Sequence, residues 1–222
     1  MQRAIFAFTI LTFMANPAMA DFRPASSAPL QNPSAAQYRA LVSKLQRGET
    51  DIDYTLLRLS YVQTADYDPH DSDVRGAFST ALIASKAGDC KTVLDKTAIV
   101  LAADFTVIDA HLMRETCFDK TGDKSSAVQE HAIALGLGRS VMKSGDGKSE
   151  DTAFVVVTQD EEGFALAMLG RHETMQSLVT GKNHSYDLLD AKDDTTGDVI
   201  SVYFQIDAIF AGEMKLFAPK KP

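Results

Sequence analysis

An internal repeat in the middle of the chain limits the possible fold more than any other feature. Gly88-Asp89 recurs as Gly122-Asp123, an offset of 34 residues. This offset is the period of arrays in which each repeat is a pair of antiparallel helices. At such a turn, glycine adopts the left-handed conformation that ends one helix, and aspartate caps the helix that follows. The pattern therefore predicts one helical hairpin over residues 73–101 and a second over residues 106–143.

Apolar residues recur at the same offset, and we expect each matched pair to face a neighbouring helix. The pairs are Phe78 with Leu112, Leu94 with Val128, Ala98 with Ala132, and Leu101 with Leu135. The period is that of tetratricopeptide repeats, but the Trp, Tyr and Pro positions of that consensus are not filled. An ordinary helical bundle with two coincident Gly-Asp pairs therefore stays open. Both interpretations predict antiparallel helices.

Two more helices are predicted upstream of the repeat. The first begins near Ala35 and ends at Gly48, because apolar residues fall at helical spacing between them. These apolar residues are Tyr38, Leu41, Val42 and Leu45. The second begins after Asp53, a good N-cap, and reaches Tyr61. We thus expect residues 34–143 to form a tetratricopeptide-like helical region.

After Lys143 the hydrophobic period changes from that of a helix to that of a strand. Residues 200–206 alternate between apolar and polar, and we expect them to form a hairpin with residues 186–189 across a polar turn at 193–198. The β-branched run 154–157 also has strand character. Residues 161–169 fit a helix or a strand equally well. The predicted fold class is α+β, with the N-terminal helical hairpins packed against a small C-terminal antiparallel sheet over residues 144–217, in one continuous domain.

The first 20 residues have the plan of a cleavable secretory signal. Arg3 precedes an apolar stretch from Ala4 to Met14, and Ala18-Met19-Ala20 forms an Ala-x-Ala cleavage site before Asp21. The apolar stretch is shorter than the roughly 20 residues that a membrane crossing needs, which weighs against an uncleaved anchor. We predict a mature chain that begins near Asp21, carries a flexible leader to residue 33 and works in the periplasm or outside the cell.

The charge of the mature chain argues against two classes of partner. Without Arg3 the chain has 21 Lys and Arg residues against 30 Asp and Glu residues, a formal net charge of −9. Such a surface repels phosphate backbones and anionic lipid. We therefore expect neither nucleic acid nor a membrane surface as a partner, and a protein or peptide remains.

The only two cysteines, Cys90 and Cys117, fall at the same end of the predicted hairpins. Cys90 opens one helix and Cys117 lies in the last turns of the next, so antiparallel packing brings them together. An oxidising compartment would let them form a disulfide that stabilises the fold by about 3 kcal/mol. Two small buried thiols are the alternative, and the sequence leaves both open.

No complete catalytic, metal or cofactor motif is present. The run 147–149 resembles the end of a phosphate-binding loop, but Met142 stands where that loop requires glycine. The acidic segment 66–73 has His70 and Asp71 where an EF-hand requires an oxygen ligand and glycine. His111 is part of neither a His-Glu-x-x-His nor a Glu-x-x-His sequence, the two helical motifs in which a histidine binds a metal ion. We predict no metal, no cofactor and no catalytic residue.

Two functions remain open. The first is a non-catalytic protein- or peptide-binding scaffold, with Arg58, Tyr61 and His111 as candidate contacts. The second is an exported hydrolase with a polar site where the helices meet the sheet. The residues of that site would be Arg58, Asp146, Glu161 and Tyr186.

A set of short motifs resembles a bacterial family catalogued as domain of unknown function 4919. The motifs are Leu57-Arg58 with Tyr61, Tyr67-Asp68-Pro69, Ser144-Gly145-Asp146-Gly147-Lys148-Ser149, Thr152-Ala153-Phe154, Glu161-Glu162, Leu169-Gly170, His184-Ser185-Tyr186-Asp187 and Tyr203-Phe204-Gln205-Ile206-Asp207. The resemblance covers about residues 54–217, nearly the whole predicted mature chain. The resemblance implies a secreted bacterial domain and carries over no catalytic residues.

Overall fold

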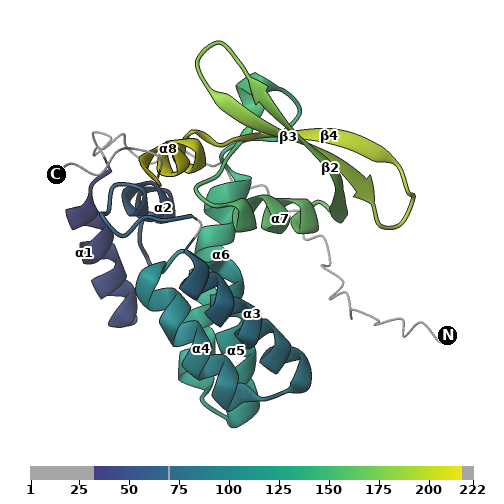
Figure 1. Cartoon of the computed structure of the whole chain (residues 1–222). Helices are drawn as coiled ribbons and strands as arrows, with labels where there is room; N and C mark the ends of the chain where they lie inside the picture. Colours follow the sequence, from purple (N-terminus) through teal and green to yellow (C-terminus); the bar gives the residue numbers. More distant parts are fainter. Residues whose placement is uncertain (1–32, 70, 217–222) are drawn as a thin grey trace, which may run out of the picture. The chain divides into compact units, whose positions relative to one another are not determined.

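The computed structural model describes residues 33–69 and 71–216, with side chains as far as residue 212 (Figure 1). The predicted secretory signal and nearly all of the predicted leader lie outside the described residues. Among the described residues, no helix has both the length and the apolar character that crossing a membrane requires.

Helices fill most of the region predicted to be helical (Figure 1). They are α1 (Ala35–Gln46), α2 (Tyr54–Tyr61), α3 (Ser72–Ala87), α4 (Cys90–Ala103), α5 (Ile108–Thr121) and α6 (Lys124–Met142). Gly88 ends α3 with φ of 76° and Gly122 ends α5 with φ of 88°. The side chains of Asp89 and Asp123 accept hydrogen bonds from backbone N–H groups in the first turns of α4 and α6. The two hairpins and the chemistry of their turns are therefore confirmed.

In the second hairpin, the predicted packing faces are wrong by one residue. Val128, Leu135 and Leu112 are 69%, 40% and 38% exposed. Buried pairs at the same offset lie one position earlier along the chain. They are Ala77 with His111, Val93 with Ala127, and Val100 with Ala134. A shift of one residue turns the buried face of a helix by about 100°. The 34-residue repeat is therefore confirmed, and the predicted buried face is wrong.

The C-terminal part combines a four-stranded sheet with two helices. It contains a short 3-10 helix η1 (Glu150–Thr152), then β1 (Phe154–Val155), α7 (Gln159–Met168), β2 (Arg171–Thr180), β3 (Ser185–Asp193), β4 (Val199–Gln205) and α8 (Asp207–Leu216). The strand order is β1-β4-β3-β2. The β3–β4 hairpin is confirmed, and Leu189 lies opposite Val202 in its register. The segment 161–169, for which the sequence favours neither helix nor strand, is helical over most of its length.

The sheet is mixed, not purely antiparallel as expected, because β1 pairs with β4 in parallel. Only two residues of the predicted 154–157 strand join the sheet. The backbone N–H of Val156 still donates to the Gln205 carbonyl at 3.2 Å. The next N–H, that of Val157, donates instead to the carboxylate of Glu161 at 2.8 Å. This side-chain acceptor turns the chain out of the sheet and into α7.

The helices and the sheet share one core, and a smaller apolar cluster surrounds the cysteines. Leu45 and Val141 from the helices pack with Phe154 and Phe204 from the sheet in the main core. Cys90 and Cys117 are joined by a disulfide with their Cα atoms 5.2 Å apart. Of the two states that the sequence allows for this pair, the structure therefore has the disulfide. It joins the start of α4 to the last turns of α5.

Candidate functional site

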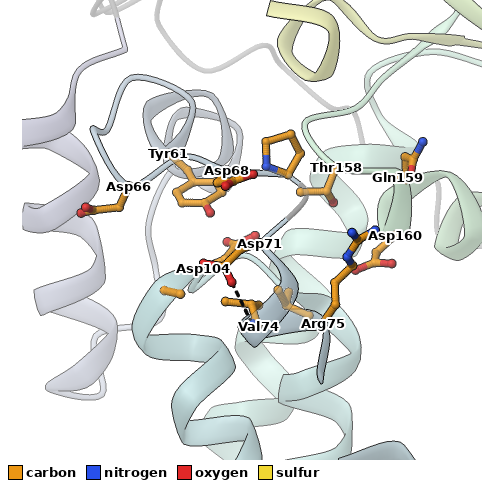
Figure 2. Close-up of a pocket in the computed structure, with 13 residues that line it drawn as sticks. Tyr61, Asp66, Asp68, Asp71, Val74, Arg75, Asp104, Thr158, Gln159 and Asp160 are labelled. Atoms are coloured by element: carbon orange, nitrogen blue, oxygen red, sulfur yellow. Dashed lines mark hydrogen bonds between the residues drawn. The ribbon is translucent and has the colours of Figure 1, made fainter. Parts of the chain in front are cut away.

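An acidic pocket of about 80 Å³ lies where the loop between α2 and α3 meets the end of α4 and the start of α7 (Figure 2). Its lining includes four carboxylates from the loop, the start of α3 and the start of α7, together with one guanidinium, that of Arg75. The four carboxylates belong to Asp66, Asp68, Asp71 and Asp160. The buried side chains of Tyr61 and Asp104 also belong to the lining. The lining thus carries far more negative than positive charge.

Tyr61, the last residue of α2, is only 3% exposed but has an unpaired hydroxyl. Its ring is held between those of Tyr38 and Tyr67, at centroid distances of 5.3 and 5.2 Å. Figure 2 shows the hydroxyl pointing toward the carboxylates of Asp71 and Asp104. No hydrogen-bond partner for this hydroxyl occurs in the part of the chain that the structure describes. Among the described residues, the fully buried side-chain atoms without a partner are Thr64 Oγ1 and Glu162 Oε1, so the Tyr61 hydroxyl opens onto the pocket and is accessible to a ligand.

Asp104 ends α4 and is 5% exposed. Its Oδ1 accepts hydrogen bonds from the backbone N–H and the hydroxyl of Thr106, at 2.7 and 2.6 Å. No donor for Oδ2 is present among residues 33–69 and 71–216. Burial, with a smaller effect from the charges of Glu161 and Asp160, raises the pKa of Asp104 to about 7, against the lowering effect of the hydrogen bonds from Thr106. This carboxyl therefore changes charge near neutral pH.

The other lining residues are placed by local structure. Asp71 is the N-cap of α3, and its Oδ1 accepts hydrogen bonds from the N–H groups of Asp73 and Val74 at 2.8 and 3.0 Å. Arg75 follows one turn later on α3. Burial raises the pKa of Asp160, and the charge of Arg75 offsets part of that rise. Tyr61 stays protonated and can donate, because burial, and next the charge of Asp104, raise its pKa well above its ordinary value.

A buried ion pair lies beside the pocket and joins α2 to α7. The guanidinium of Arg58 donates to both carboxylate oxygens of Glu161, at 2.6 and 2.5 Å. It also donates to the hydroxyl of Ser140 at 2.9 Å and to the carbonyl of Val155 at 2.8 Å. Arg58 and Glu161 are 1% and 3% exposed. Four of the five N–H groups of Arg58 and both oxygens of Glu161 are used within the protein, so this pair holds the start of α7 in place.

The structure does not bring together the four residues of the hydrolase hypothesis. Arg58 and Glu161 meet, as described above. Asp146 lies in an exposed turn, where it accepts hydrogen bonds from the backbone and the ammonium group of Lys148 at 3.1 and 2.9 Å. Tyr186 lies on β3, and its ring makes edge contacts with His184 and Tyr203. Neither Asp146 nor Tyr186 lines the acidic pocket.

His111, the third candidate contact for binding, belongs to a separate buried network. Its Nδ1 lies 2.6 Å from Glu130 and its Nε2 lies 2.9 Å from the Phe105 carbonyl. Arg114 donates to the second oxygen of Glu130 at 2.6 Å. Both imidazole nitrogens thus face acceptors inside the hairpin, and His111 is placed to join α5 to α6.

The sequence pointed to part of the pocket and not to its centre. Tyr61 and the acidic loop over residues 66–73 stand out in the sequence. No sequence pattern marks the other three important lining residues, which come from three different elements: Asp104, Asp160 and Arg75. Asp104 offers one usable signal, a lone carboxyl directly after the apolar end of a helix. Across the described residues, no group of His, Cys, Asp or Glu is placed to hold a metal ion.

Comparison with known proteins identifies a family. The model of a family described as "Domain of unknown function (DUF4919)" matches residues 29–215. This confirms the resemblance found in the motifs. No curated protein and no solved structure matches the chain.

Proposed function

Since this chain belongs to the family described as Domain of unknown function (DUF4919), a description that names no activity, we propose a function from the site itself. The protein is a non-catalytic binding module that holds a segment of a partner protein or peptide at the acidic pocket. The observation that carries this proposal is the unpaired hydroxyl of the buried Tyr61, which faces the pocket beside the free oxygen of Asp104. Both side chains are already buried before a ligand binds, and for one polar atom of each no partner occurs among the described residues.

The surroundings of the pocket favour binding over hydrolysis. A hydrolase needs a nucleophile or an activated water beside an acid or a base. The hydrolase hypothesis offers two carboxylates, Glu161 and Asp146. Both oxygens of Glu161 are occupied by Arg58, and Asp146 is bound to Lys148 in an exposed turn. The pocket instead offers hydrogen-bonding groups from the ends of four helices and from the α2–α3 loop, an arrangement that suits recognition.

The disulfide between Cys90 and Cys117 supports the compartment of this function. Disulfides persist in oxidising surroundings such as the periplasm and are rare in the cytosol. A binding module that works outside the cytosol agrees with the secretory signal predicted from the first 20 residues.

The proposal is tested by measuring peptide binding to the full chain, exported by a bacterial host and purified in oxidised form. Fluorescence anisotropy with positional-scanning pentapeptide pools should show saturable binding by a subset of pools. Tyr61→Phe, which removes only the unpaired hydroxyl, should weaken that binding about tenfold, a typical loss of one buried hydrogen bond.

Tyr203→Phe is the matched control, because Tyr203 lies on β4 and does not line the pocket. Its binding should equal that of the unmodified protein. The proposal is wrong if no pool binds, if Tyr61→Phe binds as well as the control, or if the peptides are turned over.

A further inference from the structure

We infer that the group received by the acidic pocket is an organic cation, namely a guanidinium or a primary ammonium. This inference rests on the proposed function, because it names the part of the ligand that enters the site. It goes further in specifying the chemistry of that part and the role of each facing residue.

The first support is the balance of charge around a small space. Among the residues that the structure describes, five aspartates and one guanidinium, that of Arg75, line the pocket. A volume of about 80 Å³ exceeds the 10–15 Å³ or so that one water needs. It is far below the roughly 300 Å³ of an ordinary small-molecule site. The pocket therefore suits the head group of one side chain, and an anionic head group would meet an excess of carboxylates.

The second support is the pair of atoms on buried side chains that lack partners. Oδ2 of Asp104 is an acceptor, and the Tyr61 hydroxyl can accept one hydrogen bond while it donates another. A guanidinium carries five N–H donors and an ammonium carries three, with no acceptors. Such a group would satisfy both atoms at once. The other carboxylates of the lining then neutralise the remaining charge.

The third support is the spread of the acidic groups. The carboxylates come from the α2–α3 loop, the N-cap of α3, the end of α4 and α7, and no set of them in the described parts of the chain is placed to share a metal ion. Ligand oxygens of a metal must converge within about 2.6 Å of one point. Carboxylates that surround a space without converging fit a larger cation whose donors point in several directions.

Asp104 makes the binding dependent on pH. The charged or polar groups around it come from several elements. They are Tyr38 of α1, Tyr61 of α2, Asp66 and Asp68 of the α2–α3 loop, Asp71 and Arg75 of α3, Thr106 after α4, and Asp160 and Glu161 of α7. A bound cation favours the ionised carboxylate, so a protein with Asp104 protonated must lose that proton on binding. With a pKa of about 7 for the free protein, affinity should rise about tenfold between pH 6 and pH 8.

The test is isothermal titration of the full oxidised chain with matched probes. Ala-Ala-Arg-Ala-Ala and Ala-Ala-Lys-Ala-Ala, with blocked ends, should bind, and the citrulline peptide, a neutral isostere of the arginine peptide, should bind at least tenfold more weakly. Asp104→Asn should lose at least tenfold in affinity and abolish the pH dependence. Asp95→Asn removes the same charge from an exposed position on α4 and should change affinity less than twofold.

Each other outcome has one meaning. Equal binding of the citrulline peptide that is still lost in Tyr61→Phe would overturn the cation inference and leave the peptide-binding function standing. If spermidine binds and neither peptide does, the inference of a cation site is supported and the proposed peptide-binding function is overturned. Calcium as the one cation that binds would overturn the inference. If Asp104→Asn does not fold, pH-independent binding of the arginine peptide by the unmodified protein overturns the inference by itself.

Discussion

Buried charge is concentrated in a few carboxyl groups, and each of them is stabilised in a different way. Glu161 is paired with Arg58, Glu130 accepts from His111 and Arg114, and Asp104 accepts from Thr106 alone within the described part of the chain. The paired groups join helices to one another. Asp104, which keeps a free oxygen toward the pocket, is the one available to a ligand among these three.

Breaking the Arg58–Glu161 pair should destabilise the fold strongly, because it leaves an unpaired charge in the interior. Arg58→Met is expected to lower the free energy of unfolding by about 3–5 kcal/mol, measured by urea denaturation. Lys91→Met, which breaks an exposed pair with Asp95, should cost less than about 1 kcal/mol. In a double-mutant cycle, the cost of Arg58→Met with Glu161→Met should be clearly below the sum of the two single costs. Additive costs would show that the pair does not act as a unit.

Glu162 should make the protein less stable as the solution becomes alkaline. Burial, with the added charge and hydrogen bond of Asp187, raises its pKa to about 9. Its buried Oε1 has no hydrogen-bond partner among the described residues. Because the folded state keeps a proton that the unfolded state has lost, stability falls with rising pH from about 4.5 up to the folded pKa.

The window from about pH 7.5 to 9 isolates this effect, since Asp104 titrates below it. The unmodified protein should lose up to about 1.4 kcal/mol per pH unit there, measured by urea denaturation at several pH values. Glu162→Gln should remove most of this slope, and Glu49→Gln at an exposed site should leave it unchanged. A Glu162→Gln protein with the full slope would show that Glu162 is already ionised in the folded state.

Among the connections between helices and strands, the turn between α6 and β1 requires glycine for two separate reasons. A Cβ at Gly145 would lie 2.4 Å from the backbone oxygens of Thr152 and Ala153. Gly147 has φ of 70°, and a Cβ there would lie 2.6 Å from Val202. Backbone cannot move aside as a flexible side chain can, so this turn fixes how the helices pass into the sheet.

Gly145→Ala should therefore destabilise the protein by more than about 2 kcal/mol, measured by urea denaturation. Gly76, within α3, is the contrasting position, because a Cβ added there would have no neighbouring atom within 4 Å. Gly76→Ala should stabilise the protein by about 0.5–1 kcal/mol. The explanation fails if the two substitutions have effects of the same sign.

Elements with a clear period could be predicted from the sequence, and those without one could not. The helices of both hairpins are recognisable because their turns carry Gly-Asp and their apolar residues repeat. No sequence signal predicted β2, because nearly all of its residues are exposed on both faces of an edge strand, so no alternation marks it. The prediction for β1 is too long, because the side chain of Glu161, four residues after Val157, takes the N–H that would continue the strand.

For the molecule as a whole, the fold class follows from the change of hydrophobic period after Lys143, but most of the pocket does not follow from any local pattern. Tyr61, Asp104 and Asp160 lie on α2, at the end of α4 and on α7, and they meet only through tertiary packing. The packing that leaves the Tyr61 hydroxyl and Asp104 Oδ2 unpaired is likewise a property of the assembled chain. A sequence pattern reports which residues are polar and does not report which of them lack a partner.

A crystal structure of the full oxidised chain with the arginine peptide bound would show whether the pocket contacts the cation, which affinities report only indirectly. We predict the guanidinium inside the acidic pocket, within hydrogen-bonding distance of Asp104 Oδ2 and the Tyr61 hydroxyl, about 2.7–3.2 Å. A peptide bound on another surface, with Tyr61 and Asp104 still unpaired, would contradict this prediction.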